Sequence, residues 1–304
     1  MADLGPSGVL NINKPSGMTS HDVVNRIRRL YNTKKVGHTG TLDPMASGVL
    51  VVLVGRAVKA SDLLAANGKE YRAGLKTGVS TDTQDITGNV LSVFDGALPS
   101  PEEIKNILPS FTGKIMQTPP MYSALKVGGK KLYELARQGQ TVERNAREIE
   151  IKELEYLGEG TAENEHIIRI VCSKGTYIRT LCEDIGNALG CGAVMSSLCR
   201  TRNGAFTIGN SLTIDELEGM DGSERVHAML ETESVFSELE SLSLPPFFEK
   251  LARCGNEIYL KKLGLSLSVG TRVRLYGEKG FFAIGEVCTY PDGDAVKPIK
   301  QFDI

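Results

Sequence analysis

One acidic residue of the sequence occupies a position where a carboxylate could do chemistry. Asp43 lies in a loop rich in Gly, Thr and Pro, and Pro44 holds it in an extended backbone conformation. The chain then leads directly into Val49–Val54, an unbroken β-rich run typical of a strand buried on both faces. A carboxylate fixed at the mouth of a core strand can act as a nucleophile or as a base. Most Asp-Pro sequences beside glycine are only turns, so this feature alone assigns no function.

A second candidate is Arg179, which ends the segment Lys174-Gly-Thr-Tyr-Ile-Arg179. Thr176 is a plausible N-cap for a helix, and this places Arg179 in the first helical turn. A cation there opposes the helix dipole, so the position suggests a specific anionic partner, either a carboxylate or a phosphate. A solvent-facing arginine is the alternative, because the dipole mismatch costs little.

Three further side chains could serve a site, but each is ambiguous by itself. Tyr71 shares one face of a predicted alternating strand with Ala73 and Leu75, as a core or interface tyrosine would. Lys14 precedes a helix N-terminus, where a lysine could simply be solvated. His38 lies in the Gly/Thr loop and could be an ordinary surface histidine. No function follows from any of the three alone.

The sequence offers no pattern for a metal or a phosphate loop. Its six cysteines are scattered without a Cys-x-x-Cys pair, and its four histidines show no metal-ligand spacing against them. We therefore expect no metal, no organic cofactor and reduced, partly buried thiols, as in a cytoplasmic protein. We also expect neither a signal peptide nor a membrane span, because the longest apolar run, Val49–Val54, is too short to cross a bilayer.

The formal net charge of −2 hides two basic segments. Residues 14–38 contain six Lys/Arg and one acid, and residues 122–147 contain six Lys/Arg and two acids. Residues 214–240 offset them with nine Asp/Glu and a single arginine. Phosphate binding depends on local potential, so the total does not exclude a nucleic-acid partner. Solvated faces are the alternative explanation for both basic segments.

The order of predicted elements favours an α+β fold with a mixed or antiparallel sheet, because strands and helices mix without a regular βαβ rhythm. Predicted strands cover residues 9–13, 49–54, 70–75, 148–156 and 166–173, and predicted helices cover 20–31, 131–138 and 178–189, with a further helix after Ser100. Pro245-Pro246 suggests a domain junction. Beyond it, residues 272–276, 281–287 and 296–297 are predicted as strands of a small β domain.

Five segments of the sequence combine these candidates in a fixed order. They are Lys14-Pro-Ser-Gly-Met-Thr-Ser20, Gly37-His-Thr-Gly-Thr-Leu-Asp-Pro44, Lys69-Glu-Tyr71, Gln117-Thr-Pro-Pro-Met-Tyr-Ser-Ala-Leu-Lys126 and Lys174-Gly-Thr-Tyr-Ile-Arg179. Their order and spacing resemble those of TruB-type transfer-RNA pseudouridine-55 synthases. The segments Lys131–Arg137 and Leu198–Arg202 add to this resemblance, which runs from about Val9 to Phe206 and is weaker over the C-terminal β region.

The resemblance implies a reaction and a role for each candidate. Asp43 matches the aspartate that attacks a flipped-out uridine, whose uracil is detached from C1′, turned and rejoined through C5 without a metal or organic cofactor. Arg179 would pair with Asp43 and keep it ionised; such a neighbour typically lowers an aspartate pKa by about 1–3 units. Tyr71 would stack on the target base and is a candidate for the later proton transfer at C5. His38 would occupy the space that the flipped uridine leaves.

The resemblance also implies the architecture and the partner. We expect the pseudouridine synthase fold, α+β with a mixed, largely antiparallel sheet and a central cleft, over residues 1–246, and a small PUA-like β domain over residues 247–304. We expect a monomer that binds the TψC loop and stem of tRNA, with the C-terminal domain toward the acceptor end, and modifies uridine 55. The expected substrate or RNA contacts are His38, Lys14, Tyr177, Leu198, Lys126, Lys130, Lys131, Arg137 and Arg202.

The family places a basic insertion against the RNA loop, and residues 117–147 match it. Gly128-Gly129 and Gly139 flank a short predicted helix, which would be unstable alone. We therefore predict a mobile arm that becomes ordered when it meets phosphates.

Two rival functions are less well supported by the sequence. A ribosomal-RNA pseudouridine synthase would not need the Gln117–Lys126 segment or the basic insertion, which belong to the transfer-RNA type. An RNA-folding helper without chemistry would not need the intact set of Asp43, Tyr71 and Arg179, although a folding role alongside catalysis is compatible with it. The resemblance leaves open whether Asp43 adds to the sugar or base or instead removes a ribose proton.

Overall fold

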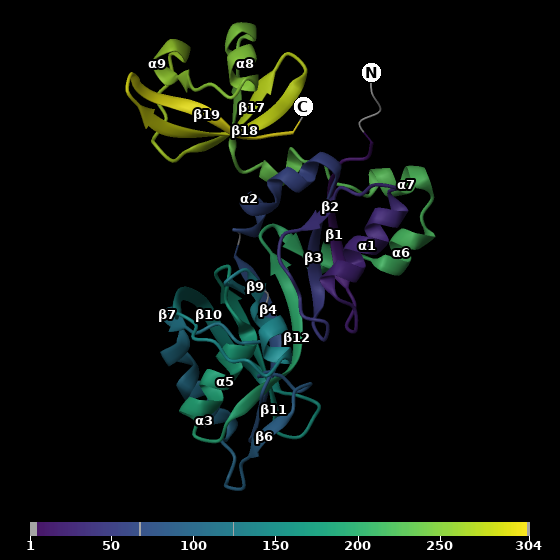
Figure 1. The fold of residues 1–304 in the computed structure, drawn as a ribbon, viewed down its shortest axis with the longest axis vertical. Coiled ribbons are helices and arrows are strands. Elements are labelled where there is room, and N and C mark those ends of the chain that lie inside the picture. Colours follow the sequence, from purple (N-terminus) through teal and green to yellow (C-terminus); the bar gives the residue numbers. More distant parts are fainter. Residues whose placement is uncertain (1–4, 67, 124, 303–304) are drawn as a thin grey trace.

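A computed structural model describes residues 5–66, 68–123 and 125–302 of the chain. A ten-stranded sheet dominates it, with the strand order β14-β1-β3-β12-β4-β11-β10-β7 and with β2 and β13 paired to β3 and β12 (Figure 1). These strands are β1 (Gly8–Lys14), β2 (Val36–His38), β3 (Ser47–Val54), β4 (Lys69–Thr77), β7 (Gly113–Gln117), β10 (Arg147–Glu159), β11 (Glu165–Cys172), β12 (Ala193–Asn203), β13 (Phe206–Thr207) and β14 (Leu212–Thr213). The β1–β14 and β3–β12 pairs are parallel and the remaining pairs of this sheet are antiparallel.

Helices and short hairpins surround this sheet. The helices are α1 (Ser20–Leu30), α2 (Ser61–Ala65), α3 (Pro101–Ile107), α4 (Leu132–Arg137), α5 (Ile178–Ala188), α6 (Ile214–Gly219) and α7 (Gly222–His227), with 3-10 turns η1 (Gly55–Ala60), η2 (Leu108–Phe111), η3 (Ile208–Asn210) and η4 (Ser234–Phe236). The hairpins are β5 (Val79–Thr81) with β6 (Val90–Val93), and β8 (Lys126–Val127) with β9 (Lys130–Lys131).

Strand β3 lies at the centre of the core, and both of its faces are buried. Val49 and the five residues after it are each at most 1% exposed. Leu50, Val52 and Val54 pack into one apolar cluster with α1 and α5, whereas Val49, Val51 and Leu53 pack into a second cluster that includes Phe302. The doubly buried strand expected from the unbroken apolar run is confirmed.

Helix α1 covers the first of these clusters, and its start is specified locally. Thr19 is the N-cap: its side chain accepts from the Asp22 N–H (3.0 Å), and the Asp22 carboxylate accepts in return from the Thr19 N–H (2.9 Å). This reciprocal capping box satisfies two helix-end donors. The apolar stripe of the helix, including Val23 and Ile27, is fully buried.

The large sheet divides into two halves next to Asp43. Strands β3 and β12 pair only at Ser47–Cys199 and Gly48–Arg200 and then diverge. Gly48 has a φ of +98°, and a Cβ there would lie 2.3 Å from the Arg200 carbonyl oxygen, so the crossing requires glycine. The hollow that opens beside the crossing has a volume of about 430 Å³; residues from both halves line it, among them Ser16, Met45, Arg72, Ile167, Ser197 and Leu198.

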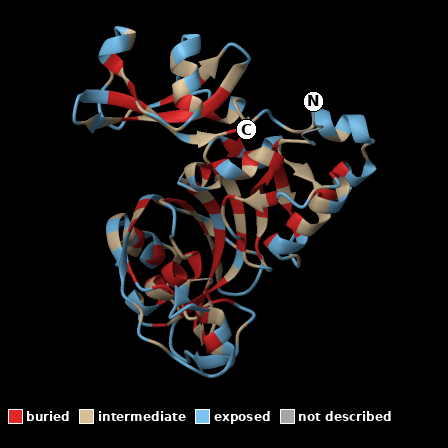
Figure 2. Cartoon of the chain, turned by 45° about the horizontal axis from the view of Figure 1, so that its top comes forward, coloured by how far each residue is buried: buried red, intermediate tan, exposed pale blue. Residues whose placement is uncertain are grey.

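A second sheet forms the C-terminal part of the molecule (Figure 1). Its five strands follow the order β15-β17-β18-β19-β16, with helices α8 and α9 packed on them. The bounds are β15 (Glu240–Ser243), α8 (Pro246–Arg253), β16 (Ile258–Tyr259), α9 (Leu260–Leu263), β17 (Arg272–Gly277), β18 (Gly280–Tyr290) and β19 (Gly293–Gln301). Figure 2 shows buried residues running along the strands of both sheets. The second sheet is joined to the first by apolar contacts of Ile284 and Phe302 and by the Lys300–Asp62 ion pair (2.9 Å).

The expected α+β class with a mixed, largely antiparallel sheet and a small C-terminal β domain is confirmed. Most predicted strands and helices are present within a few residues of their predicted ends. The sequence did not predict β12, which lies at the centre of the sheet, nor β2 or α8. The second sheet also begins at β15, before the boundary predicted at residue 247.

Candidate active site

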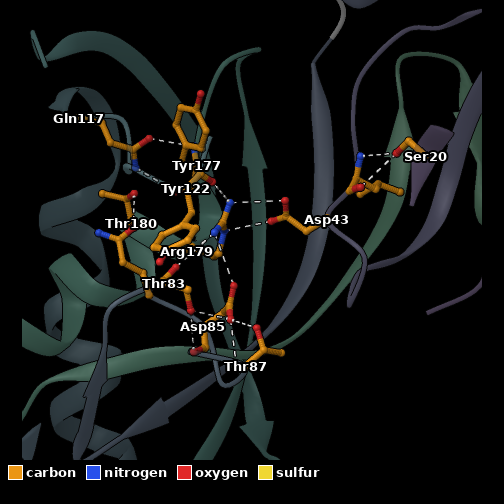
Figure 3. A network of polar contacts seen from close by, with 12 residues as sticks. Ser20, Asp43, Thr83, Asp85, Thr87, Gln117, Tyr122, Tyr177, Arg179 and Thr180 are labelled. Atoms are coloured by element: carbon orange, nitrogen blue, oxygen red, sulfur yellow. Dashed lines mark hydrogen bonds and ion pairs between the residues drawn. The ribbon is translucent and has the colours of Figure 1, made fainter. Parts of the chain in front are cut away.

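Asp43 lies on the loop between β2 and β3, at the point where the sheet divides. The loop is held on both sides of the carboxylate. The buried Ser20 hydroxyl accepts from the Leu42 N–H (2.8 Å) and donates to the Leu42 carbonyl (3.1 Å), and the Ala46 N–H donates to the Asp43 carbonyl (3.0 Å). The Asp43 side chain remains 35% exposed, so it is fixed in direction yet open to a substrate (Figure 3).

Lys14 supports this loop from beneath and does not face solvent. Its side chain is fully buried, and its ammonium donates to the carbonyls of Pro15 (2.8 Å), Met18 (2.6 Å) and Pro44 (3.4 Å). Burial lowers the pKa of Lys14 to about 8, although Asp43 opposes this shift. A buried ammonium cannot meet a phosphate, so the structure does not support the predicted contact of Lys14 with RNA and gives it a structural role instead.

Arg179 pairs with Asp43 through two contacts. The Arg179 Nε lies 3.0 Å from Asp43 Oδ2, and the Arg179 Nη2 donates to Asp43 Oδ1 at 3.4 Å. Arg179 stands in the first turn of α5, whose N-cap is Tyr177, and only 7% of it is exposed. The anionic partner expected from its position against the helix dipole is therefore a carboxylate.

A second carboxylate, which the sequence did not reveal, completes the network. Asp85 Oδ2 lies 3.5 Å from the Arg179 Nη1, and Asp85 is 5% exposed. Its other oxygen accepts from the Thr87 N–H (3.0 Å) and from the Thr83 hydroxyl (2.9 Å). Figure 3 shows the guanidinium held between the two aspartates. The only sequence signal was the dense Thr/Asp pattern of residues 81–87, which is also typical of an ordinary turn.

Gln84 connects helix α5 to the turn on which Asp85 lies. Its φ is +64°, a left-handed conformation that costs a non-glycine residue energy. Its side-chain carbonyl accepts from the Thr180 hydroxyl (2.8 Å), and its amide donates to the Glu183 carboxylate. Its backbone carbonyl accepts from the Met195 N–H of β12 (3.1 Å). The turn is thereby tied to the helix that supplies Arg179 and to the strand beside the hollow.

Opposing influences set the pKa of Asp43. Burial raises this pKa above its ordinary value of 3.8, Arg179 and Lys14 lower it, and Asp85 raises it again. The predicted lowering by Arg179 is present, but burial together with Asp85 outweighs it, so the net shift is upward. Asp43 is a carboxylate whose charge depends on its guanidinium partner, and such groups are typical of reactive sites.

Tyr71 and Arg200 lie opposite each other on β4 and β12 at the base of the site. Tyr71 is 7% exposed, and burial raises the pKa of its phenol despite the opposing influence of Arg200, so the hydroxyl is protonated at neutral pH. Arg200, another residue that was not singled out from the sequence, is 1% exposed and donates to the carbonyls of Val49 (2.6 Å) and Gly40 (3.0 Å). It ties β12 to the loop that carries Asp43.

His38 lies on β2 at the start of the same loop. Its Nδ1 accepts from the Gly40 N–H (3.3 Å), and burial together with Arg200 and His21 lowers its pKa, so the ring is neutral. Leu198 is 8% exposed and lines the hollow. The Tyr177 backbone is bonded on both sides to Gln117, whose amide donates to its carbonyl (3.0 Å) and accepts from its N–H (2.8 Å).

The insertion predicted as an RNA-binding arm leaves the sheet beside this network. The Tyr122 carbonyl accepts from the Arg179 Nη2 (2.9 Å), so the base of the arm contacts the Asp43–Arg179 pair. The helix expected at 131–138 is α4, and it follows the β8–β9 hairpin, whose turn is Gly128-Gly129. Lys126, Lys130 and Arg137 are exposed and Lys131 is half-buried, whereas Arg202, outside the arm, pairs with Glu70 at 3.5 Å.

The part of the chain that the structure describes contains neither a metal-binding cluster nor a membrane-spanning helix. No group of three or more His, Cys, Asp or Glu side chains is arranged to hold a metal ion. No helix of those residues is both long enough and apolar enough to cross a membrane.

Comparison with known proteins agrees with this geometry. Residues 28–178 match the family model of the TruB family pseudouridylate synthase N-terminal domain, and residues 179–241 match that of the tRNA pseudouridylate synthase B C-terminal domain. The chain is 43% identical over 292 residues to the tRNA pseudouridine synthase B of Pelotomaculum thermopropionicum, covering 94% of this chain and 92% of that protein. It is 44% identical over 283 residues to that of Alkaliphilus oremlandii, covering 92% and 93% of the two chains.

Two solved structures contain chains with a similar fold. A structure of a Cbf5-Nop10-Gar1 complex contains a chain that superposes with a TM-score of 0.72 at 28% identity, covering 97% of this chain and 84% of that one. A structure of an H/ACA RNP bound to a substrate RNA containing 2′-deoxyuridine matches with a TM-score of 0.71 at 25% identity, covering 98% and 85%.

The divided mixed sheet and an aspartate held by a guanidinium at its cleft define an RNA-modifying isomerase of the pseudouridine synthase fold. More particularly, the chain belongs to the TruB family of tRNA pseudouridine synthases.

Proposed function

We propose that the chain converts uridine 55 in the TψC loop of tRNA to pseudouridine, with Asp43 as the catalytic carboxylate. The bidentate contact between Arg179 and Asp43 is the observation that carries the proposal. It fixes the direction of a partly exposed carboxylate at the point where the sheet divides. The family membership and the names of the relatives support tRNA as the substrate.

The reaction needs a base that has left the stack of the RNA loop. The C1′–N1 bond breaks, the uracil turns, and a C1′–C5 bond forms; the proton lost from C5 is balanced by the proton that N1 gains in the product. Asp43 either adds to the sugar or base or removes a ribose proton, and both routes require its ionised form. Arg179 stabilises the ionised form of Asp43, which burial disfavours.

The remaining residues of the site position the base. Tyr71 stacks on the uracil, a role that suits a buried, protonated phenol better than that of a resting base. The neutral ring of His38 occupies the space left in the RNA loop, and Leu198 contacts the base from the wall of the hollow. Base flipping costs stacking energy in the RNA, which these contacts offset.

RNA binding is assigned to surfaces outside this network. The arm meets the TψC loop and stem through Lys126, Lys130, Lys131 and Arg137, and Arg202 and Tyr177 contact the RNA near the cleft. The PUA-like C-terminal domain, divided from residues 1–246 near residue 247, lies toward the acceptor end. The protein acts in the cytoplasm as a monomer, and the arm becomes ordered when RNA binds.

The test is to incubate the purified chain with an unmodified tRNA transcript and to map pseudouridine nucleotide by nucleotide. The Asp43→Asn variant is the matched control, because the amide keeps the shape and loses the anion. We expect product at position 55 with the parent and none with the variant. Product at another position, or only in ribosomal RNA, would show that the proposed substrate position is wrong. Accelerated tRNA folding without any pseudouridine would favour the folding-helper alternative.

A further inference from the structure

Six cations gather at the end of β3 that lies away from Asp43. They are Arg28, Arg29, Lys34, Lys35, Arg56 and Lys59, and we name them the strand-end basic cluster. The backbone brings them together. The Gly55 N–H donates to the Lys35 carbonyl (2.7 Å), and the Arg28 Nη2 donates to the carbonyl of Val36 (3.4 Å), which pairs with Val54. The C-terminal end of α1, the entry to β2 and the turn η1 are thus neighbours, and each segment carries two of the six cations.

The described residues do not neutralise this cluster with acidic side chains. Among the residues that the structure describes, no carboxylate lies within ion-pair distance of any of the six side chains. Asp62, which follows η1 closely in sequence, is already paired with Lys300. Four of the six side chains, those of Arg29, Lys34, Lys35 and Lys59, are exposed. Uncompensated like charges on exposed side chains indicate a binding surface for a polyanion.

The cluster lies far from the reacting base. The eight residues of β3 run from Ser47, beside the cleft, to Val54, beside the cluster. At about 3.3 Å per residue this strand is about 23 Å long, so one nucleotide cannot contact both places. An RNA that contacts both must extend well beyond the flipped uridine and its neighbours.

The composition of the cluster favours phosphates over bases. Its exposed members are lysines and arginines, and the nearby Tyr31 is 6% exposed, with its hydroxyl donating to the Arg225 carbonyl (2.6 Å). The ring of Tyr31 is therefore not available there for a base to stack on. The arm differs, because Lys131 and Arg137 both lie over the Tyr133 ring. Cations without stacking partners contact the backbone of a duplex and carry no sequence information.

We propose that the strand-end basic cluster binds the phosphate backbone of the tRNA helix beyond the TψC stem-loop, as an RNA-binding surface separate from the arm. The proposal rests on tRNA being the substrate, as proposed above. Its chemical content is a set of phosphate contacts made through the exposed side chains of Arg29, Lys34, Lys35 and Lys59.

The experiment compares two charge-neutralised variants on two RNAs. The test variant is Lys34→Gln/Lys35→Gln/Lys59→Gln, and the matched control is Lys105→Gln/Lys114→Gln/Lys152→Gln, which removes the same charge from exposed positions on α3, β7 and β10. The RNAs are a full-length unmodified tRNA transcript and a stem-loop that contains only the TψC loop and its own stem. Binding is titrated over a salt series, and pseudouridine formation is followed at saturating protein.

For the test variant on full-length tRNA, we expect the magnitude of the log–log salt slope to fall by about 2–3 units. On the stem-loop its slope should match the parent, and the control variant should match the parent on both RNAs. The rate at saturation should be unchanged throughout. An unchanged slope on tRNA, or an equal loss on the stem-loop, would overturn the proposal. The parent could form no pseudouridine while the test variant still shows a smaller salt slope on tRNA. That result would refute the proposed reaction and support the proposed RNA-binding surface.

Discussion

The catalytic network and the arm are neighbours that use arginine and lysine in opposite ways. In the network one buried guanidinium, 7% exposed, is shared between Asp43, Asp85 and the carbonyls of Thr83 (3.2 Å) and Tyr122 (2.9 Å). In the arm most of the cations are exposed, and the described residues give them few fixed partners. The network therefore depends on the shape of each group, and the arm depends on its total charge.

This difference predicts how each region responds to substitution. A charge-conserving change should damage the network and leave the arm intact, whereas removal of several charges should damage the arm and leave the network intact. The arm could influence the network through two described contacts: the Tyr122 carbonyl, which accepts from Arg179, and the Gln117 side chain, which is bonded to the Tyr177 backbone at the start of α5.

The largest effect among the positioning residues is expected for Arg179→Lys. Lysine keeps the charge but loses the planar fork that contacts both Asp43 oxygens. We expect the single-turnover rate to fall about 10²-fold, as for a displaced catalytic group, with RNA affinity nearly unchanged. Rapid-quench product analysis and a binding titration on one preparation measure the two quantities. An affinity loss as large as the rate loss would place Arg179 on the RNA rather than on Asp43.

Asp85→Asn should change the pH dependence of the reaction. The rate requires ionised Asp43, so it falls as the pH drops through the Asp43 pKa, which burial and Asp85 raise above 3.8. Removal of the Asp85 charge removes one of the raising influences and leaves Arg179 free for Asp43. The inflection of the acid limb should therefore move to lower pH, even if the plateau rate also falls. An inflection that moves to higher pH would contradict the assigned coupling.

Gln84→Gly should separate the positioning of Asp85 from folding. Glycine relieves the φ of +64° but loses the two side-chain hydrogen bonds to Thr180 and Glu183. At about 1 kcal/mol for each bond, or about 2 kcal/mol together, the rate should fall by up to about 30-fold, and the pH profile should move in the same direction as for Asp85→Asn. Thermal unfolding of the two proteins checks that stability changes little. A rate loss without any change in the pH profile would indicate only a general structural role.

The smallest effect on chemistry is expected from the arm. Replacing Lys130, Lys131 and Arg137 together by Gln should weaken tRNA binding and reduce the log–log salt slope by roughly one unit for each lost phosphate contact. The rate at saturating protein should change by less than about threefold, because Asp43, Arg179 and Asp85 lie outside the arm. A salt series on the variant and the parent tests this. An unchanged slope would make the insertion a structural elaboration.

The sequence predicted the elements whose own residues determine them. The apolar run 49–54 and the residues that begin the helices at 20 and after Ser100 each specify an element locally, and the predicted strand and both helices are present. Strand β12 was missed because its segment around Leu198–Arg202 alternates too little to indicate a strand. Its pairing with β4 and with the start of β3 is long-range and leaves no local signal.

The site was predicted unevenly for the same reason. Asp43 and Arg179 stand at positions that local rules already mark, namely a residue before proline and a cation in a first helical turn. Asp85 and Arg200 carry no such mark, and their importance comes from side-chain contacts between distant segments. The lowering of the Asp43 pKa by Arg179 could be predicted from a motif, whereas the opposing effect of burial cannot be read from a loop sequence.

The most direct test of the account measures rate and affinity on one preparation of the Asp43→Asn protein. Single-turnover pseudouridine formation on unmodified tRNA should fall at least about 10³-fold, as expected when an essential catalytic group is removed. The Kd for the same tRNA should stay within about twofold of the parent, because the surfaces assigned to RNA binding are untouched. Product at close to the parental rate would remove Asp43 from the mechanism and contradict the account.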